Sequence, residues 1–163
     1  MLFRSSLRGA TVIAVDIDKA KLETAKKLGA HHVINSKLEK LHEKLEKLTN
    51  GNGPSVVIEA AGSPVTYKAA IDEVAFCGRV VCIGYAKDEV LFPTKLWVQK
   101  ELEIMGSRNA NPSDFESVIK YLKNSQLDER ILISKIVEPE DAPDAMRDWS
   151  QNTGEILKIL VKF

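Results

Sequence analysis

Short runs of apolar residues alternate along this chain with segments in which apolar and polar residues follow a helical spacing. The apolar runs are rich in valine and isoleucine and show no polar alternation, which is typical of parallel strands buried on both faces. We predict strands at residues 9–18, 31–34, 55–59, 79–83 and 102–105. Strands that alternate with helices over short connections indicate an α/β fold, a mostly parallel sheet covered by helices.

Helices are predicted between these strands from their apolar stripes and their end signals. Residues 19–28 follow the first strand, and residues 113–123 follow the last, with Asn111 or Ser113 as the N-cap. Pro64 stands where a helix begins and Gly78 where it has ended. The inward-facing stripe of this helix comprises Tyr67, Ala70, Ile71 and Val74.

A further helix carries four leucines on one face, Leu38, Leu41, Leu45 and Leu48. Their spacing also fits a coiled coil, but two heptads are short for one, and an ordinary amphipathic helix packed on the sheet explains the same leucines. The last stretch differs from the rest, because strands at 133–137 and 156–161 enclose a short helix at 141–149.

The charge balance excludes several classes of partner. Lys plus Arg and Asp plus Glu number 23 each, so no net field attracts nucleic acid or an anionic membrane surface. The sequence contains no secretory segment and no apolar run of membrane-spanning length, and Cys77 and Cys82 are its only cysteines. We therefore expect a cytoplasmic protein without nucleic-acid or membrane partners.

The residues that usually carry metal or nucleophilic chemistry are few and scattered. Cys77 and Cys82 have no further ligand pair nearby, so we predict reduced thiols in the core. The sequence places no carboxylate or hydroxyl partner beside His31, His32 or His42, and we expect structural roles or none for them. We predict no metal site and no catalytic residue in this chain.

The predicted strand ends share a feature that matters for ligand binding. Asp16 closes the first strand, and residues 59–64, 83–85 and 106–109 stand at the ends of the third, fourth and fifth strands, each of these three turns with a glycine. In a doubly wound sheet the ligand lies across the carboxyl ends of the strands. Glycine there lets the backbone approach a flat ring or a ribose. The simpler alternative is that these glycines only turn the chain.

Five strings, in order, carry a resemblance to a known family: GATVIAVDIDKAKLETAKKLGAHHVIN, VVIEAAGSP, GRVVCIGY, ELEIMGSRNA and GEILKILVKF. The chain resembles the cofactor-domain half of the medium-chain, zinc-type alcohol and polyol dehydrogenases, and is most similar to the sorbitol, threonine and galactonate-type members. The resemblance implies a Rossmann-like doubly wound parallel sheet that here lacks its first strand and glycine-rich turn. It divides the chain into a truncated NAD-binding domain at 1–131 and a return segment at 132–163 that in relatives packs on the catalytic domain.

The resemblance also implies roles for particular residues. Asp16 would bind the adenosine ribose hydroxyls with Lys21 nearby, and the alternative is that Asp16 or Asp18 caps the following helix. We expect Asp18 to be the cap and Asp16 the ligand. The remaining implied cofactor-binding residues are Ala60, Ala61 and Gly62 at the adenine and ribose, Ile83, Gly84, Tyr85, Ser107, Arg108 and Asn109 at the nicotinamide, and Lys158 near the pyrophosphate.

NAD is the expected cofactor, because NADP would place a phosphate where Asp16 lies. Two unit charges about 4 Å apart at an effective dielectric constant of about 20 repel by roughly 4 kcal/mol. In the family, catalytic zinc is bound by Cys, His and Glu ligands of an N-terminal domain, and none of those motifs occurs here, so zinc belongs only to the intact enzyme.

We therefore expect the NAD-binding portion of an enzyme that transfers hydride between NAD and a secondary alcohol of a small polyol, sugar acid or other alcohol, and that forms a homo-oligomer. The alternatives are a non-catalytic nucleotide-binding or subunit-association module, or an inert gene fragment. The absent first strand would lie in mid-sheet. Three outcomes are then possible. The two strands beside it would close up and pair, a second chain would supply the strand, or the folded chain would have low stability.

Overall fold

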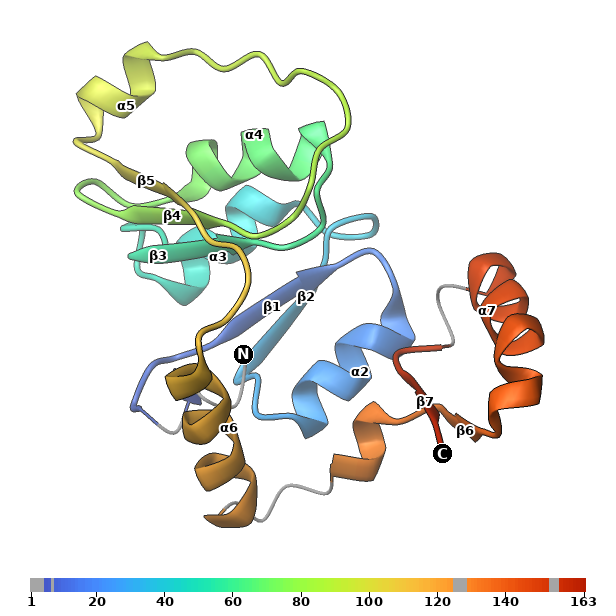
Figure 1. Cartoon of the computed structure of the whole chain (residues 1–163). Coiled ribbons are helices and arrows are strands. Elements are labelled where there is room, and N and C mark those ends of the chain that lie inside the picture. The colour runs from blue at the N-terminus through green and yellow to red at the C-terminus, as the bar shows by residue number, and fades with distance from the viewer. Residues whose placement is uncertain (1–4, 7, 125–128, 153–155) are drawn as a thin grey trace. The chain divides into compact units, whose positions relative to one another are not determined.

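The computed structural model describes residues 5–6, 8–124, 129–152 and 156–163. These residues fall into two compact units (Figure 1). The first comprises Met1–Glu39 and Pro112–Phe163, and the second comprises Lys40–Asn111. The division that the sequence predicts, between residues 131 and 132, stays a prediction.

The first unit begins with a β–α–β element. Strand β1 (Ile13–Asp16) and strand β2 (His32–Asn35) pair in parallel, and helix α2 (Lys19–Lys27) connects them and packs on both. Leu22 and Ala25 of α2 are buried, as is Ile34 of β2. The apolar spacing predicted this strand, helix and strand, and the structure confirms them.

The rest of the first unit contains the predicted helix after residue 111, the two strands and one helix predicted near the end of the chain, and two 3-10 helices that were not predicted. Helix α6 (Pro112–Asn124) and the 3-10 helix η1 (Glu129–Leu132) come first. Strands β6 (Lys135–Val137) and β7 (Ile159–Val161) then form a separate parallel pair. Between them in sequence lie the 3-10 helix η2 (Pro139–Asp141) and helix α7 (Ala142–Gln151).

The second unit is built on a three-stranded parallel sheet. Strands β3 (Val56–Glu59), β4 (Arg79–Cys82) and β5 (Glu103–Gly106) lie in the order β3-β4-β5. The helices of this unit are α3 (Leu41–Leu48), α4 (Pro64–Glu73) and α5 (Lys95–Gln99). The order within each sheet fits a doubly wound arrangement, because strands that are consecutive in the sequence pair in parallel and are connected through helices.

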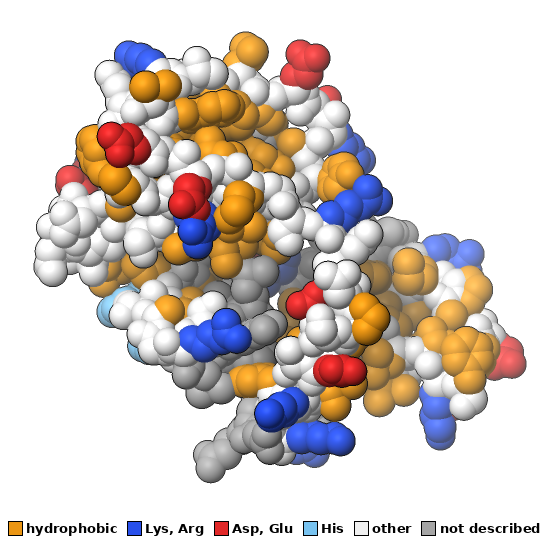
Figure 2. Space-filling view, turned by 60° about the vertical axis from the view of Figure 1, so that its left-hand side comes forward, with side chains coloured by type: hydrophobic (Ala, Val, Ile, Leu, Met, Phe, Trp, Pro, Cys, Tyr) orange, Lys and Arg blue, Asp and Glu red, His pale blue; other side chains and the backbone are white. Residues whose placement is uncertain are grey.

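The core of the second unit lies between α4 and its sheet. Ala70 and Ile71 of α4, Val74 directly after it and Val80 of β4 are each at most 4% exposed. This confirms the predicted inward positions of Ala70, Ile71 and Val74, while Tyr67 is half-buried. Partly buried side chains surround this cluster, among them Val57, Phe92, Leu96, Trp97 and Leu102. Other apolar side chains of this unit are open on its surface in Figure 2.

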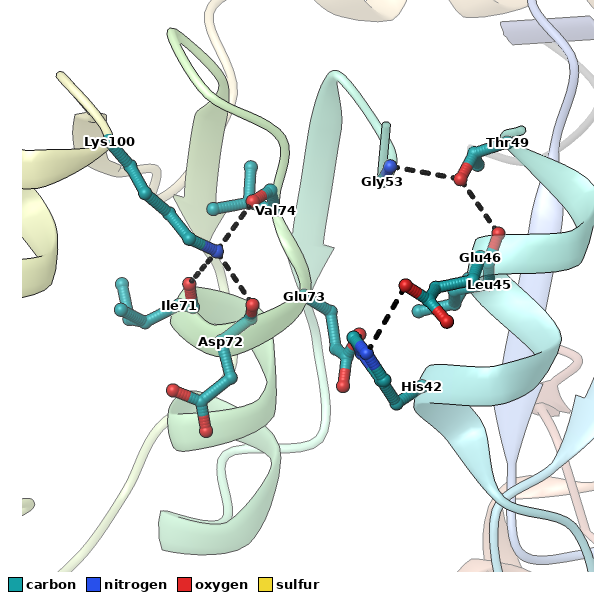
Figure 3. A network of polar contacts seen from close by, with 10 residues as sticks. All are labelled: His42, Leu45, Glu46, Thr49, Gly53, Ile71, Asp72, Glu73, Val74 and Lys100. Atoms are coloured by element: carbon teal, nitrogen blue, oxygen red, sulfur yellow. Dashed lines mark hydrogen bonds and ion pairs between the residues drawn. The ribbon is translucent and has the colours of Figure 1, made fainter. Parts of the chain in front are cut away.

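Both ends of helix α4 are stabilised by side-chain hydrogen bonds to the main chain. At its start Ser63 and Thr66 form a capping box, and Pro64 is the first helical residue. At its end the Lys100 ammonium group donates to the main-chain carbonyl groups of Ile71, Asp72 and Val74 at 3.3, 2.6 and 2.8 Å (Figure 3). A cation at this place satisfies carbonyl groups that a helix end leaves unpaired.

His42 corrects an expectation from the sequence, because it does have a carboxylate partner. Its Nδ1 lies 2.9 Å from Glu73 Oε2, so the ring links α3 to α4 (Figure 3), and its Nε2 lies 3.6 Å from Glu46 Oε1. The hydrogen bond with Glu73 and the charges of Glu73 and Glu46 raise the pKa of His42 above its usual 6.5. The contact joins residues 31 apart in sequence, beyond the reach of a helical spacing rule.

Three further details differ from the predictions. Helix α3 begins after Lys40, so it does not include Leu38. Leu38 lies instead in a turn in which the Asn35 carbonyl group accepts its main-chain NH, and it is 78% exposed. Cys77 is exposed, so the prediction of a core thiol was wrong for it. Helix α4 ends at Glu73, five residues before Gly78.

The strand pairing bears on the predicted alternative in which the two neighbours of a mid-sheet strand close up and pair. Among the described strands, β1 pairs only with β2, and β3 pairs only with β4. The alternative in which β1 and β3 pair directly is therefore not seen. No helix among the described residues is long and apolar enough to cross a membrane.

Candidate functional site

A cavity of about 460 Å³ lies at the carboxyl ends of β4 and β5 in the second unit. Five of the residues that the resemblance implies for the nicotinamide line it together: Ile83, Gly84, Tyr85, Ser107 and Arg108. The other lining residues were not predicted to bind a cofactor; they are Tyr67, Cys82, Ala86, Val90, Phe92 and Gly106. The wall is mostly apolar, with a few polar groups, as is usual for a small-molecule site.

Two glycines allow the turns after β3 and β4 to touch. Gly62 has a φ of +69°, and a Cβ there would lie 2.5 Å from the carbonyl oxygen of Tyr85. A Cβ on Gly84 would lie 2.3 Å from the main-chain nitrogen of Gly62 and 2.4 Å from Glu59 Oε2. Any side chain at either position would therefore separate the two turns. The glycines have a packing role here, and Gly84 also forms part of the cavity wall.

Glu59 joins these turns and was not among the predicted site residues. Its side chain is 3% exposed, and its Oε1 accepts hydrogen bonds from the main-chain NH groups of Ala61 and Gly62 at 3.0 and 2.8 Å. Its main-chain carbonyl group accepts from the NH groups of Ile83 and Gly84. The signal in the sequence is an acid that ends an otherwise apolar strand.

The inner side of the cavity contains a phenol and a thiol. The hydroxyl group of Tyr67 donates to the Gly84 carbonyl group at 2.7 Å. Burial, with smaller effects of Cys82 and Glu59, raises the pKa of Tyr67 above its usual value. Burial and the charge of Glu59 raise the pKa of the Cys82 thiol. Both groups are therefore neutral near pH 7, and Cys82 is a free, half-buried thiol as predicted.

The outer rim is open to solvent. Tyr85 is 76% exposed, and the guanidinium carbon of Arg108 lies 5.9 Å from the centre of its ring. Asn109 is exposed with a φ of +63°, and Ala60 and Ala61 are exposed on the turn after β3. These last three do not line the cavity. A ligand at this rim would meet an aromatic face and a cation.

Asp16 and Asp18 make different contacts in the first unit, and the structure confirms the predicted cap role of Asp18. Asp18 is the N-cap of α2, because its Oδ1 accepts the main-chain NH groups of Ala20 and Lys21. Asp16 ends β1, and its Oδ1 accepts the NH of Asp18 at 2.9 Å. Its Oδ2 has no hydrogen-bond partner among the described residues, so this oxygen of the half-buried Asp16 is available to a ligand. The adjacent Ile17 side chain, which the sequence analysis did not single out, is 66% exposed.

The two remaining predicted lysines also lie in the first unit. Lys21 is half-buried in the first turn of α2. Lys158 precedes β7 with an exposed side chain, and its main-chain carbonyl group accepts from the NH of Ser134. The described residues contain no group of three or more His, Cys, Asp or Glu side chains arranged to bind a metal ion.

Comparisons with known proteins agree on one family. The sequence model of the family described as zinc-binding dehydrogenase matches residues 5–124. The chain is 34% identical over 155 residues to an uncharacterized zinc-type alcohol dehydrogenase-like protein of Haemophilus influenzae, covering 95% of this chain and 45% of that protein. It is 30% identical to a sorbitol dehydrogenase of Bacillus subtilis, covering 93% of this chain and 43% of the relative.

Solved structures give the same result for the fold. Benzyl alcohol dehydrogenase of Acinetobacter calcoaceticus superposes with a TM-score of 0.87 at 26% identity, over 99% of this chain and 45% of that structure. An alcohol dehydrogenase of Escherichia coli solved with NADH superposes with a TM-score of 0.85 at 26% identity, over 98% of this chain and 47% of that structure. The chain spans less than half the length of these relatives, and it belongs to the zinc-binding dehydrogenase family.

Proposed function

We propose that this chain is the part of a zinc-type dehydrogenase that binds NAD, with Asp16 on the adenosine ribose. The observation that carries the proposal is the free Oδ2 of Asp16 at the carboxyl end of a parallel strand, next to a helix that already has its own cap in Asp18. A carboxylate that the helix does not need is available to accept hydrogen bonds from a diol. This is the end of the sheet at which ligands of doubly wound folds bind.

The cavity of the second unit would receive the nicotinamide part of NAD. Its volume of about 460 Å³ suits a ring and its ribose, and Gly84 places main chain rather than a side chain at the wall. Bound NAD would supply a carbon that accepts hydride from an alcohol. The chain's own task would be to orient that ring with Ile83 and Gly84 and to cover its outer side with Ser107 and Arg108.

The remaining predicted contacts belong to this proposal as well. Lys21 would lie beside the ribose, and Ala60, Ala61 and Gly62 would flank the adenine and ribose. Tyr85 and Asn109 would lie at the outer side of the nicotinamide, and Lys158 would approach the pyrophosphate. Each is a proposal that a substitution at that residue can test.

The intact enzyme would oxidise a secondary alcohol of a small polyol, sugar acid or similar compound. The sorbitol dehydrogenase relative supports a polyol as the substrate class. Zinc ligands and substrate contacts are expected in a further domain of the intact enzyme, which we propose is a homo-oligomer in the cytoplasm.

The charge of Asp16 gives the proposal a sharp test. The 2′-phosphate of NADPH would approach that carboxylate to about 4 Å, and the repulsion of roughly 4 kcal/mol at an effective dielectric constant of 20 corresponds to well over a hundredfold in affinity. Fluorescence titration of the chain should therefore detect NADH binding and little NADPH binding. Binding of neither dinucleotide would instead favour a module for subunit association or an inert fragment.

A further inference from the structure

Glu59 is buried, and only one of its two carboxylate oxygens accepts hydrogen bonds. Oε1 accepts three hydrogen bonds, from the NH groups of Ala61 and Gly62 and from the Thr66 hydroxyl group at 2.6 Å. Oε2 is buried and has no hydrogen-bond partner among the described residues. An unpartnered charged oxygen inside a protein is costly unless something in the functional state compensates it.

The free oxygen lies next to the wall of the cavity. It is Oε2 that a Cβ on Gly84 would approach to 2.4 Å, and Gly84 is one of the residues that line the cavity. Because Gly84 has no side chain, the Glu59 carboxylate packs directly against the main chain of this lining residue. A charge in such a buried place is screened much less by salt and water than a charge on the surface.

We propose that the Glu59 carboxylate makes the wall formed by Cys82 and Gly84 favour a positively charged ring over a neutral one, so that its charge raises the affinity of the cavity for oxidised NAD⁺ relative to NADH. The proposal rests on the proposed function, because it concerns the same cavity. The oxidised nicotinamide ring carries a positive charge and the reduced ring is neutral, while the rest of the cofactor is the same. Their difference in affinity therefore reports the electrostatic potential at the ring.

The other charged group at the cavity acts in the opposite direction but more weakly. Arg108 is the only charged side chain among the described residues that line it, and Arg108 is exposed, so solvent screens its charge. The thiol of Cys82, on the inner wall, senses the same negative potential, since Glu59 is the second cause after burial of its raised pKa. The inner wall is thus more negative than the rim.

The test compares the dissociation constants of NAD⁺ and NADH for the full chain and its Glu59→Gln variant. Glutamine has the same shape, and its carbonyl oxygen can accept the same three hydrogen bonds, so the charge changes while the turns keep their contacts. We expect the preference for NAD⁺ relative to NADH to fall about tenfold, as removal of a buried charge near the ring predicts. A purely structural role of Glu59 would weaken both cofactors equally and would overturn the proposal.

The matched control is Thr66→Val, which keeps the charge of Glu59 and removes one donor from its Oε1. The preference for NAD⁺ should stay or rise in this variant, and a fall would contradict the proposal even if Glu59→Gln did not fold. Circular dichroism spectra verify that each variant is folded.

A second readout does not depend on cofactor binding. The pKa of the Cys82 thiol, measured from the pH dependence of its alkylation in a Cys77→Ser background, should fall in Glu59→Gln. If neither dinucleotide binds the wild-type chain, the proposed function fails. The pKa of the Cys82 thiol then still tests the potential at the cavity wall: a lowered pKa in Glu59→Gln supports a negative potential from Glu59, and an unchanged pKa overturns it.

Discussion

The contact between Lys100 and the end of α4 gives the clearest prediction about stability. Substitution of Lys100 by methionine keeps the aliphatic stem and removes the ammonium group that donates to the carbonyl groups of Ile71, Asp72 and Val74. Hydrogen bonds to a charged group contribute about 1.5 to 3 kcal/mol, and a cation at a helix C-terminus contributes about 0.3 to 1 kcal/mol. Because the Asp72 end of the contact is exposed to solvent, we expect a total loss of about 2 kcal/mol.

The assay is thermal unfolding followed by circular dichroism. For a chain of this size, a loss of about 2 kcal/mol corresponds to a decrease in Tm of roughly 4 to 8 °C. The matched control is Lys68→Met. Lys68 is exposed on α4, the helix whose end Lys100 contacts, and the substitution makes the same change in net charge. If the Tm of Lys100→Met lay within about 1 °C of that control, the reasoning about the helix end would be refuted.

Two further predictions concern other contacts of the second unit. Since Glu73 raises the pKa of His42, their contact stabilises the fold fully below about pH 6.5 and is lost as the pH rises through the folded-state pKa. His42→Gln should therefore lower the Tm at about pH 6 and leave it unchanged at about pH 8.5, and an equal effect at both would contradict this. Gly62→Ala should cost more than about 2 kcal/mol of unfolding free energy in urea, since its Cβ would meet the Tyr85 carbonyl group, whereas Gly51→Ala, with equally positive φ but open space, should cost about 1 kcal/mol.

Much of the fold could be predicted because the strands and helices have strong local signals. The β-branched runs give β1, β3 and β4, and the proline after Ser63 gives the start of α4. The assignment of Asp18 as a cap followed from its place one residue before the helix, and the structure confirms it. Leu38 was wrongly placed in a helix because the leucine spacing continued through a turn whose hydrogen bonds to Asn35 could not be foreseen.

The features that sequence reasoning missed depend on contacts between distant residues or on the main chain. Helix α5 has only five residues, too few for a recognisable stripe. The contact of His42 with Glu73 depends on how two helices pack. Glu59 has a signal in the sequence, as an acid that ends an apolar strand, but its hydrogen bonds to main-chain NH groups are seen only in the structure. The predicted residues at the cavity could be named in advance because the family resemblance assigns cofactor contacts to the turns that follow these strand ends.

The central claim is that Asp16 binds the adenosine ribose of NAD, and the Asp16→Asn variant tests it most directly. Asparagine removes the charge that repels the phosphate of NADPH and keeps the size of the side chain. The account predicts that calorimetric titration finds a strong preference for NADH in the wild-type chain and a loss of at least about tenfold of that preference in the variant. An unchanged ratio of the NADH and NADPH dissociation constants would contradict it.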